Sequence, residues 1–418
     1  MRVERFSGRA TPGEIRALVP APPRVEQEVH AIVAEVRNDG DDAVRRLTAQ
    51  FDPADVAPRD LAVPPAEIES AVGTLEPSVL RGLRTAIAGV REVARAQLCE
   101  DLVVDLPDGQ RVEVTEAPVR RAAAYVPGGR APYPSTLVMC AVTATAAGVD
   151  ELAVCAPPGP EGRAHPTILA AACLCGVTEV YRMGGAQAIA ALAYGTESVA
   201  PVDLIAGPGN AYVREAKRQV AGHVGIDGLA GPSELVVAAS GEADPELVAL
   251  DLLAQSEHGA DALLVLVTPD GALARAVERA VTALAGDRPS AAEGVVGVAH
   301  VASPAAAVAL ADALAPEHLE LVGKDVEALT GRVRAAGCIF VGRDAGTAFG
   351  DYVAGSNHVL PTGGAARFQS GLSVATFRRR MARVSLPAGA AARLAPAGAA
   401  LARAEGFPIH GESMERRA

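Results

Sequence analysis

Short apolar segments rich in β-branched residues alternate with longer Ala-rich segments over most of this chain, in two series. The first series occupies residues 151–222, and the second occupies residues 234–342, from ELVVAAS to CIFVG. This rhythm is typical of strands joined by crossover helices, and it predicts parallel sheets with helices on both faces. We therefore expect an α/β fold of two Rossmann-like, doubly wound modules, with a helical N-terminal segment and an extended C-terminal tail.

The C-terminal tail differs from both series in composition. From about Leu386 the chain is too often broken by Gly and Pro to build a core of its own, yet it ends with two residues able to do chemistry, Glu405 and His410. A tail of this kind either frays or packs on a partner subunit.

The charge balance excludes two classes of partner. The net charge is −12, whereas nucleic acids and anionic membranes are bound by basic surfaces. The dense basic run at residues 378–380 is expected to be a solvated helix face. No apolar run approaches membrane-spanning length, and the N-terminal residues have charges where a signal peptide needs an apolar stretch. We expect a soluble cytoplasmic protein with neither nucleic acid nor membrane as a partner.

The six cysteines are scattered through apolar segments without the spacing of a zinc site. This distribution is typical of buried thiols in a reducing compartment. Cys140 could be imagined as the thiol that captures an aldehyde during oxidation, but no histidine stands near it in the sequence. A buried thiol without a base or cation beside it stays protonated, so we do not expect this role.

Gln255 and His258 stand three residues apart in DLLAQSEHGAD, near the end of a helix predicted to begin at Pro245. Residues three apart lie on one helix face, so both side chains could bind one ion. Imidazole nitrogen and amide oxygen suit zinc or a neighbouring divalent metal. The alternative is a histidine that interacts with the dipole of the helix C-terminus.

Glu317 and His318 lie in APEHLEL, between a predicted helix and a predicted strand, where catalytic groups commonly stand. If both face one cavity, a carboxylate and an imidazole can pass protons at neutral pH. Asp351 and His358 follow in FGDYVAGSNHVLPT. Taken alone, these two are more typical of a turn cap and a loop residue.

Two strand-to-helix junctions in the first series contain glycines, at residues 181–187 and 205–210. Glycines there let a phosphate or ribose approach the backbone at a helix N-terminus. Gly207, Gly209 and Ala211 match the dinucleotide-binding fingerprint only in part, so a tight structural turn remains open. Upstream, residues 125–129 add a tyrosine and two glycines, with an ordinary turn as the alternative.

Seven segments, in their order along the chain, closely resemble those of the zinc-dependent histidinol dehydrogenases, and the likeness runs from about Val25 to the C-terminus. The segments are YVPGGRAPYPST, RMGGAQAIAALAYGTES, AGPGNAYVREAKRQV, GIDGLAGPSE, LLAQSEHGAD, APEHLEL and FGDYVAGSNHVLPTGGAARFQSGLSV. Seven ordered segments are far more specific than any single glycine pattern.

The resemblance implies a homodimer with shared active sites, one zinc ion per subunit and NAD as the oxidant of an amino alcohol, L-histidinol, which passes through L-histidinal to L-histidine. Carried over position by position, the zinc ligands would be Gln255, His258, Asp351 and His410, and the acid/base pair would be Glu317 and His318. Substrate contacts would come from Ser233, Gln255, His258, His318, Asp351, His358, Glu405 and His410. Contacts to NAD would come from Tyr125, Gln187 and Asn210.

The same resemblance divides the chain into segments. We expect a helical N-terminal segment at residues 1–24, and a first Rossmann-like module made of residues 25–124 and 235–371 that carries the metal and acid/base residues. A second module at residues 125–234 would face NAD, and a tail at residues 372–418 would reach the partner subunit.

Three residues depart from the usual pattern of the resembling proteins. Thr143 and Thr145 stand where proline and lysine are usual, and Leu204 stands where lysine is common. None is a predicted ligand or acid/base residue, so these departures bear on local helix starts and on cofactor affinity.

Three other functions remain open on the residues. A related zinc- and NAD-dependent dehydrogenase could oxidise a hydroxyalkyl sulfonate, although Glu405 suits an ammonium group better than a sulfonate. A zinc hydrolase would use Glu317 as base without a nicotinamide. A non-catalytic nucleotide-binding module would leave Glu317 and His318 unexplained.

Overall fold

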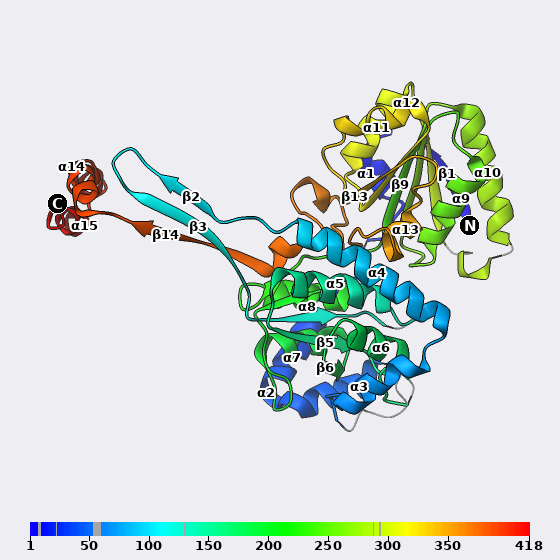
Figure 1. Ribbon diagram of the computed structural model, residues 1–418. Coiled ribbons are helices and arrows are strands. Elements are labelled where there is room, and N and C mark those ends of the chain that lie inside the picture. The colour runs from blue at the N-terminus through cyan, green and yellow to red at the C-terminus, as the bar shows by residue number, and fades with distance from the viewer. Residues whose placement is uncertain are drawn as a thin grey trace.

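The computed structural model describes residues 1–6, 10–21, 23–52, 60–128, 131–159, 161–286, 288–291 and 294–418. Two α/β modules, each built around its own parallel sheet, are stacked on one another, and an arm projects from the side of one of them (Figure 1). No helix in these residues is both long enough and apolar enough to cross a membrane.

Sheet A has six parallel strands in the order β1-β11-β10-β9-β12-β13. The strands are β1 (Arg2–Phe6), β9 (Glu234–Ala239), β10 (Leu263–Thr268), β11 (Val295–His300), β12 (His318–Val322) and β13 (Cys338–Val341). Its helices are α1 (Pro12–Arg16), α9 (Pro245–Ser256), α10 (Gly271–Gly286), α11 (Pro304–Leu314), α12 (Lys324–Glu327) and α13 (Thr347–Tyr352). Helices α9 and α10 cover one face, and α1, α11 and α12 cover the other.

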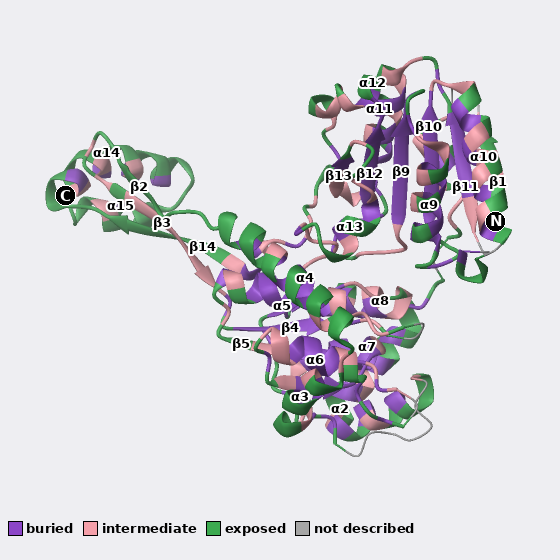
Figure 2. Ribbon diagram, turned by 45° about the vertical axis from the view of Figure 1, so that its right-hand side comes forward, coloured by how far each residue is buried: buried purple, intermediate pink, exposed green. Residues whose placement is uncertain are grey.

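The central strands of sheet A are buried and mainly apolar because helices cover both of their faces. Every residue of β9, β10 and β12 is buried, and these strands are purple in Figure 2. The helix starts follow from side chains that cap free backbone N–H groups. Asp244 caps α9 by accepting from Glu246 N, and Ser303 caps α11 by accepting from Ala306 N, each with a proline at the start of the helix.

Sheet B has five parallel strands in the order β6-β5-β4-β7-β8. The strands are β4 (Arg121–Tyr125), β5 (Glu151–Ala156), β6 (Glu179–Arg182), β7 (Leu204–Ala206) and β8 (Gly225–Ile226). Its helices are α2 (Glu26–Phe51), α3 (Pro65–Ala71), α4 (Pro77–Ala96), α5 (Pro134–Ala147), α6 (Pro166–Leu174), α7 (Gly185–Tyr194) and α8 (Ala211–Val220). One apolar core joins the sheet to α3–α6, and the other joins it to α2, α7 and α8.

The arm is a three-stranded antiparallel sheet that ends in two helices (Figure 1). Its elements are β2 (Leu102–Asp105), β3 (Arg111–Pro118), β14 (Arg378–Ser385), α14 (Ala388–Ala404) and α15 (Pro408–Glu415). The tail therefore pairs with a hairpin formed by residues 102–118. The basic run at residues 378–380, expected on a helix, lies on strand β14.

The two-module α/β architecture is confirmed, but several predicted boundaries are wrong. Residues 102–118 form strands of the arm and β4 lies in sheet B, although both were assigned to the first module. Helix α2 packs on α7 and α8, α3 packs on α6, and α4 packs on α5. Residues 26–96 therefore belong to the sheet B module and not to the module of residues 235–371. Residues 1–24 are not simply helical, because β1 adds an edge strand to sheet A beside β11. An amphipathic pattern reveals which side of an element is buried but not which sheet covers it.

The modules touch at a contact between two glycines. Gly89 lies on α4 of the sheet B module, and Gly355 follows α13 of the sheet A module; a Cβ at Gly89 would lie 3.2 Å from the Gly355 Cα. Side chains are absent at both positions, so the two backbones approach closely there.

Two of the three departures from the family pattern lie in the second half of α5, not at a helix start. Thr143 is buried and its hydroxyl donates to Met139 O at 2.6 Å, whereas Thr145 is exposed. Leu204 is buried at the start of β7. The structure therefore gives no support to an effect of Thr143 and Thr145 on a helix start.

Candidate active site

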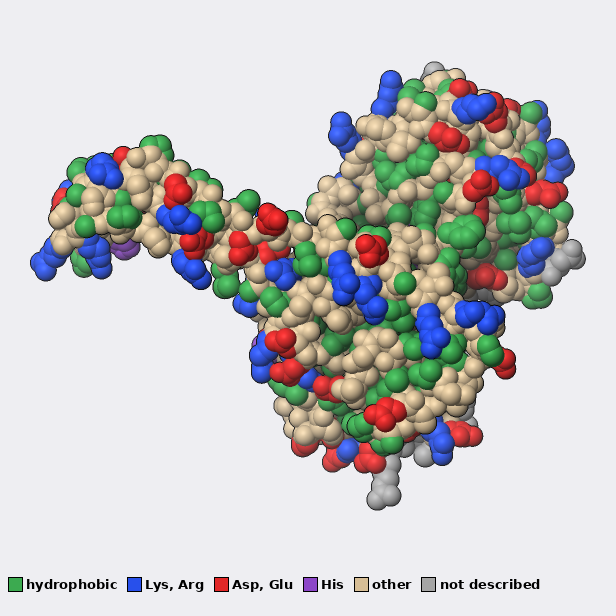
Figure 3. Space-filling view, viewed as in Figure 1, with side chains coloured by type: hydrophobic (Ala, Val, Ile, Leu, Met, Phe, Trp, Pro, Cys, Tyr) green, Lys and Arg blue, Asp and Glu red, His purple; other side chains and the backbone are tan. Residues whose placement is uncertain are grey.

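A cavity of about 860 Å³ opens between the two modules, which meet at the waist of the molecule in Figure 3. Sheet A contributes the amino ends of β9 and β12, and sheet B contributes residues 127–128 and 208–211, which follow β4 and β7. These two strands are neighbours in sheet B, but the helices after them, α5 and α8, pack on opposite faces. In open α/β sheets, ligands bind at such a switch point.

Glu317 and His318 both line this cavity, at the start of β12. The Glu317 Oε2 atom accepts hydrogen bonds from Ser233 Oγ and from Glu234 N, both at 2.8 Å. The His318 Nδ1 atom lies 3.0 Å from Glu234 O, to which it can only donate. In the neutral form of the ring, the proton on Nδ1 leaves the lone pair on Nε2, the atom that faces Asp351 Oδ1 at 3.7 Å.

The electrostatic surroundings of the two cavity histidines differ. Burial alone would lower the pKa of His318, but the carboxylates of Glu317 and Asp351 offset this effect and raise the pKa to about 9. Burial lowers the pKa of His358 despite the nearby charge of Asp351. The His358 ring is held between Asp351 O at 2.8 Å and Thr136 Oγ1 at 3.1 Å. These surroundings favour the protonated form of His318 and the neutral form of His358.

Two of the four predicted metal ligands, His258 and Asp351, line the cavity. A third, Gln255, is bonded to a lining residue, because its Nε2 donates to Ser233 Oγ. That bond leaves the Gln255 Oε1 atom without a hydrogen bond to any described residue, in keeping with an oxygen ligand. His410 and Glu405 instead lie at the end of the arm, exposed and far from this cavity in the same chain (Figure 1).

Within the described residues, no cluster of three or more His, Cys, Asp or Glu side chains is arranged to hold a metal ion. Of the predicted ligands, only His258 and Asp351 are of these residue types and line this cavity, so the predicted ligand set stays a prediction.

The three residues predicted to contact NAD are dispersed. Asn210 lines the cavity, although its Oδ1 caps α8 by accepting from Tyr212 N and Val213 N. Tyr125 and Gln187 do not line it; both are buried on the side of sheet B that packs against α2 and α7. Gly129, the last residue of the predicted 125–129 turn, lies outside the described residues.

Several lining residues escaped the sequence-based prediction, namely Arg16, Thr136, Arg214, Glu234, Asp261 and Tyr352. Glu234 had a usable signal, since it directly follows Ser233 at the start of an apolar strand. Arg16 had none, because its partner Glu234 is 218 residues away in the chain.

All six cysteines are free, and Cys140 is buried inside α5. Burial raises the pKa of the Cys140 thiol far above its ordinary range. The expectation that this thiol is no nucleophile is consistent with its position.

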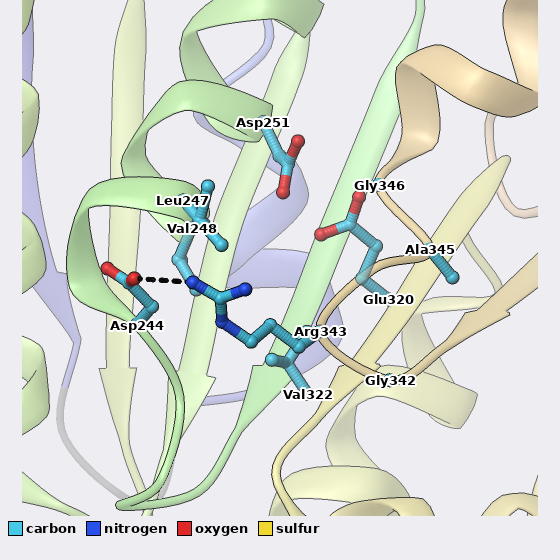
Figure 4. A pocket seen from close by; sticks show the side chains of 10 residues that line it. All are labelled: Asp244, Leu247, Val248, Asp251, Glu320, Val322, Gly342, Arg343, Ala345 and Gly346. Atoms are coloured by element: carbon cyan, nitrogen blue, oxygen red, sulfur yellow. Dashed lines mark hydrogen bonds and ion pairs between the residues drawn. The ribbon is translucent and has the colours of Figure 1, made fainter.

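A second, much smaller cavity of about 10 Å³, room for about one water molecule, lies behind α9. Figure 4 shows the carboxyl groups of Asp251 and Glu320 facing it, with Arg343 paired to Asp244 at its edge. Glu320 Oε1 accepts from the N–H and the hydroxyl of Thr347, while Oε2 is buried without a hydrogen bond partner among the described residues. The cavity is too small for a substrate.

The family model described as histidinol dehydrogenase matches residues 20–418. The chain belongs to the histidinol dehydrogenase family. As a member of it, the protein is an oxidoreductase of histidine biosynthesis.

Individual histidinol dehydrogenases match over nearly their full length. The protein from Gluconobacter oxydans is 46% identical over 399 residues, covering 94% of this chain and 93% of its own. The protein from Rhodospirillum rubrum is 47% identical over 404 residues, covering 94% and 92%. The crystal structure of histidinol dehydrogenase from Elizabethkingia anophelis superposes with a TM-score of 0.93 at 30% identity, covering 99% and 97%.

Proposed function

We propose that the protein oxidises L-histidinol through L-histidinal to L-histidine, with two NAD per substrate. One observation carries the proposal: the Glu317–His318 pair is anchored on β9 and faces a cavity whose other wall is the switch point of sheet B. A proton-transfer pair thereby lies opposite a site suited to a dinucleotide.

The wall formed by sheet B supports NAD as the oxidant. Gly207 has a φ of +123° and a Cβ there would overlap the Tyr125 carbonyl oxygen, so the turn after β7 stays close to β4. The N-terminus of α8 follows, where the helix dipole favours a phosphate. Arg214, on the next turn of α8, lines the cavity without an ion pair to any described residue, so its charge is available to a pyrophosphate.

The donor set supports a zinc ion held by Gln255, His258, Asp351 and the partner's His410. Amide oxygen, imidazole and carboxylate are ligands that zinc accepts, and the free Oε1 of Gln255 fits this role. Zinc in this place would orient the amine and imidazole of the substrate and offset the charge of Asp351 beside His318.

The reaction divides between the two acid/base groups. In the first half, His318 Nε2 accepts the hydroxyl proton of histidinol as the carbinol carbon gives its hydride to NAD, leaving the aldehyde. In the second half, Glu317 accepts a proton from water as the water oxygen adds to the aldehyde. The hydrate then gives a hydride to a second NAD and becomes the carboxylate. Ser233, His358 and the partner's Glu405 would hold the substrate in place.

The charge of the cavity favours an amino alcohol over a hydroxyalkyl sulfonate. Four carboxyl side chains line it, Glu234, Asp261, Glu317 and Asp351, against the two guanidinium groups of Arg16 and Arg214. Arg16 is already paired with Glu234. The remaining carboxylates suit an ammonium group and repel a sulfonate.

A homodimer with exchanged arms is part of the proposal. Apolar side chains on the arm are exposed, including Leu102 on β2 at 61%, Leu401 on α14 at 67% and Ile409 on α15 at 77%. Figure 3 shows hydrophobic side chains in green along this projection. A surface of this kind supports burial against a second copy, which would bring His410 and Glu405 to the partner's cavity. The free cysteines support a cytoplasmic location.

The test is to count reduced cofactor. The purified, zinc-loaded protein is incubated with NAD and a panel of amino alcohols and hydroxyalkyl sulfonates, and absorbance of reduced nicotinamide is followed. Two reduced cofactors per histidinol consumed are expected. One per substrate, or turnover of sulfonates in place of histidinol, would refute the proposal.

A further inference from the structure

Arg16 and Glu234 form a polar cluster that contacts both members of the acid/base pair. Arg16, at the end of α1, reaches the cavity wall and makes two parallel bonds to Glu234, Nη1 to Oε1 at 2.7 Å and Nη2 to Oε2 at 3.2 Å. Its Nη2 also donates to Leu314 O, at the end of the helix that precedes Glu317. A two-pronged bond of this kind fixes direction as well as charge.

Glu234 in turn contacts both members of the acid/base pair. Its backbone N–H donates to the Glu317 carboxylate at 2.8 Å, and its backbone carbonyl lies 3.0 Å from His318 Nδ1. Its carboxylate accepts from Glu317 N at 3.2 Å and from Gly363 N at 2.8 Å. One residue therefore holds the carboxyl group of Glu317, the backbone before His318 and the ring of His318.

The Glu234 carboxylate is buried, with only 5% of the side chain exposed. A buried carboxylate without a counter-charge is strongly unfavourable, and here a second one, Glu317, lies beside it. Arg16 is the cation that pairs with Glu234, and 25% of its own side chain is exposed. Without Arg16, the carboxylates of Glu234 and Glu317 would repel one another. This repulsion would disturb the alignment of Glu317 with His318.

We propose that Arg16 is a positioning residue of the reaction. It acts through Glu234 to hold Glu317 and His318 where they can exchange protons with the substrate. Arg16 stands before residues 20–418, which the family model covers. This inference rests on the proposed acid/base roles of Glu317 and His318, and it assigns to the N-terminal segment a part in the chemistry.

The experiment compares Arg16→Met, Glu234→Gln and the double variant with the wild-type protein. The expected result for Arg16→Met is a loss of about 100-fold in kcat with the Kd for NAD within about twofold, since positioning defects act on the transition state. Adding Glu234→Gln to Arg16→Met removes the unpaired charge. The kcat of this double variant is expected to be at least about tenfold higher than that of Arg16→Met. A purely structural role would lower the melting temperature without this rescue.

The matched control is Arg5→Met, which breaks an ion pair of β1 with Glu278 on the far side of the same module. It is expected to leave kcat unchanged. A loss in Arg5→Met equal to that in Arg16→Met, unchanged kcat in Arg16→Met, or no rescue in the double variant would overturn the proposal. If Arg16→Met does not fold, Arg16→Gln replaces it, with the same rescue expected because the Glu234 charge is again unpaired.

A second readout does not depend on turnover. In nitrogen-15 spectra, the Nδ1–H proton of His318, identified by its absence in His318→Gln, is expected to be protected from exchange in the wild type. Arg16→Met should abolish that protection, and the double variant should restore it. If the wild type fails to oxidise histidinol, the proposed function fails, while unchanged protection in Arg16→Met would overturn the positioning role by itself.

Discussion

Gln255 donates its side-chain N–H to the hydroxyl of Ser233, which itself donates to Glu317 at 2.8 Å. A predicted metal ligand on α9 and a predicted acid/base residue before β12 are thus joined through one serine. The link fixes the orientation of the Gln255 amide, because only its oxygen remains free to bind a cation. The five predictions below follow from this and related contacts.

Replacing His258 by Asn should remove the bound metal and lower turnover by about 100-fold or more, because one of few ligands is lost. The Kd for NAD should stay within about twofold, since the wall formed by sheet B is untouched. Metal analysis and cofactor titration check this, with His30→Asn on exposed α2 as control. Full activity with undiminished metal would contradict the ligand role.

Replacing Glu317 by Gln should slow oxidation of the aldehyde more than oxidation of the alcohol, by about tenfold or more, since only the aldehyde step needs an activated water. Single-turnover rates started from histidinol and from histidinal separate the two. Ser233→Ala, which removes a hydrogen bond to the same carboxylate, is the comparison. Equal slowing of both steps would refute the assigned role.

Replacing Arg214 by Met should weaken NAD binding by about tenfold, the effect of losing one charge-assisted bond to phosphate. The control is Arg218→Met on the same helix, where the guanidinium is already paired with Glu215. Calorimetric titration with NAD at two salt concentrations measures both. Equal affinities in the two variants would show that Arg214 does not contact the cofactor.

Replacing Glu320 by Gln should flatten the pH dependence of stability. Burial, together with the charge of Asp251, raises the pKa of Glu320 to about 8, and burial raises that of Asp251 to about 6. An acid whose pKa is raised by folding stabilises the fold below its unfolded pKa of about 4.3, and this stabilisation disappears as the pH rises through its folded pKa.

The free energy of unfolding of the wild type should therefore fall between pH 5 and pH 8. This fall should exceed that of Glu320→Gln by on the order of 3 kcal/mol. Melting curves over this range measure the difference, with Glu242→Gln on the exposed surface as control. A constant difference between wild type and variant at all pH values would exclude the buried acid pair as its cause.

Mixing two inactive variants should restore activity if arms are exchanged. In a mixed dimer of His258→Asn and His410→Asn subunits, one site carries both changes and the other carries neither. Subunits unfolded and refolded together should regain about one quarter of wild-type activity. Each variant refolded alone is the control, and no recovery in the mixture would place His410 outside the partner's site.

The sequence was sufficient for the parts of the fold that depend on local pattern. The runs at residues 151–156, 263–268 and 318–322 are strands, and the helix from Pro245 carries Gln255 as expected. The strand RVERF at residues 2–6 escaped prediction because an edge strand with alternating charges resembles a polar segment. Its identity comes from pairing with β11, almost 300 residues later.

The same limit applies to the site. His258, Asp351, Glu317 and His318 line one cavity as predicted from the resemblance, whereas the roles of Tyr125 and Gln187 remain predictions. The Arg16–Glu234 pair was out of reach, since only the folded chain brings α1 to the start of β9. Buried ion pairs of this kind are set by tertiary packing and leave no trace in local spacing.

The close approach of Gly89 to Gly355 has a consequence for rate. The predicted acid/base pair lies on the sheet A module and the predicted NAD wall on the sheet B module, so the distance between them depends on how the two modules pack. A methyl group at Gly89 would lie 3.2 Å from the Gly355 Cα, and one of the two backbones would have to shift. We therefore expect a substitution that touches neither substrate nor cofactor to slow hydride transfer.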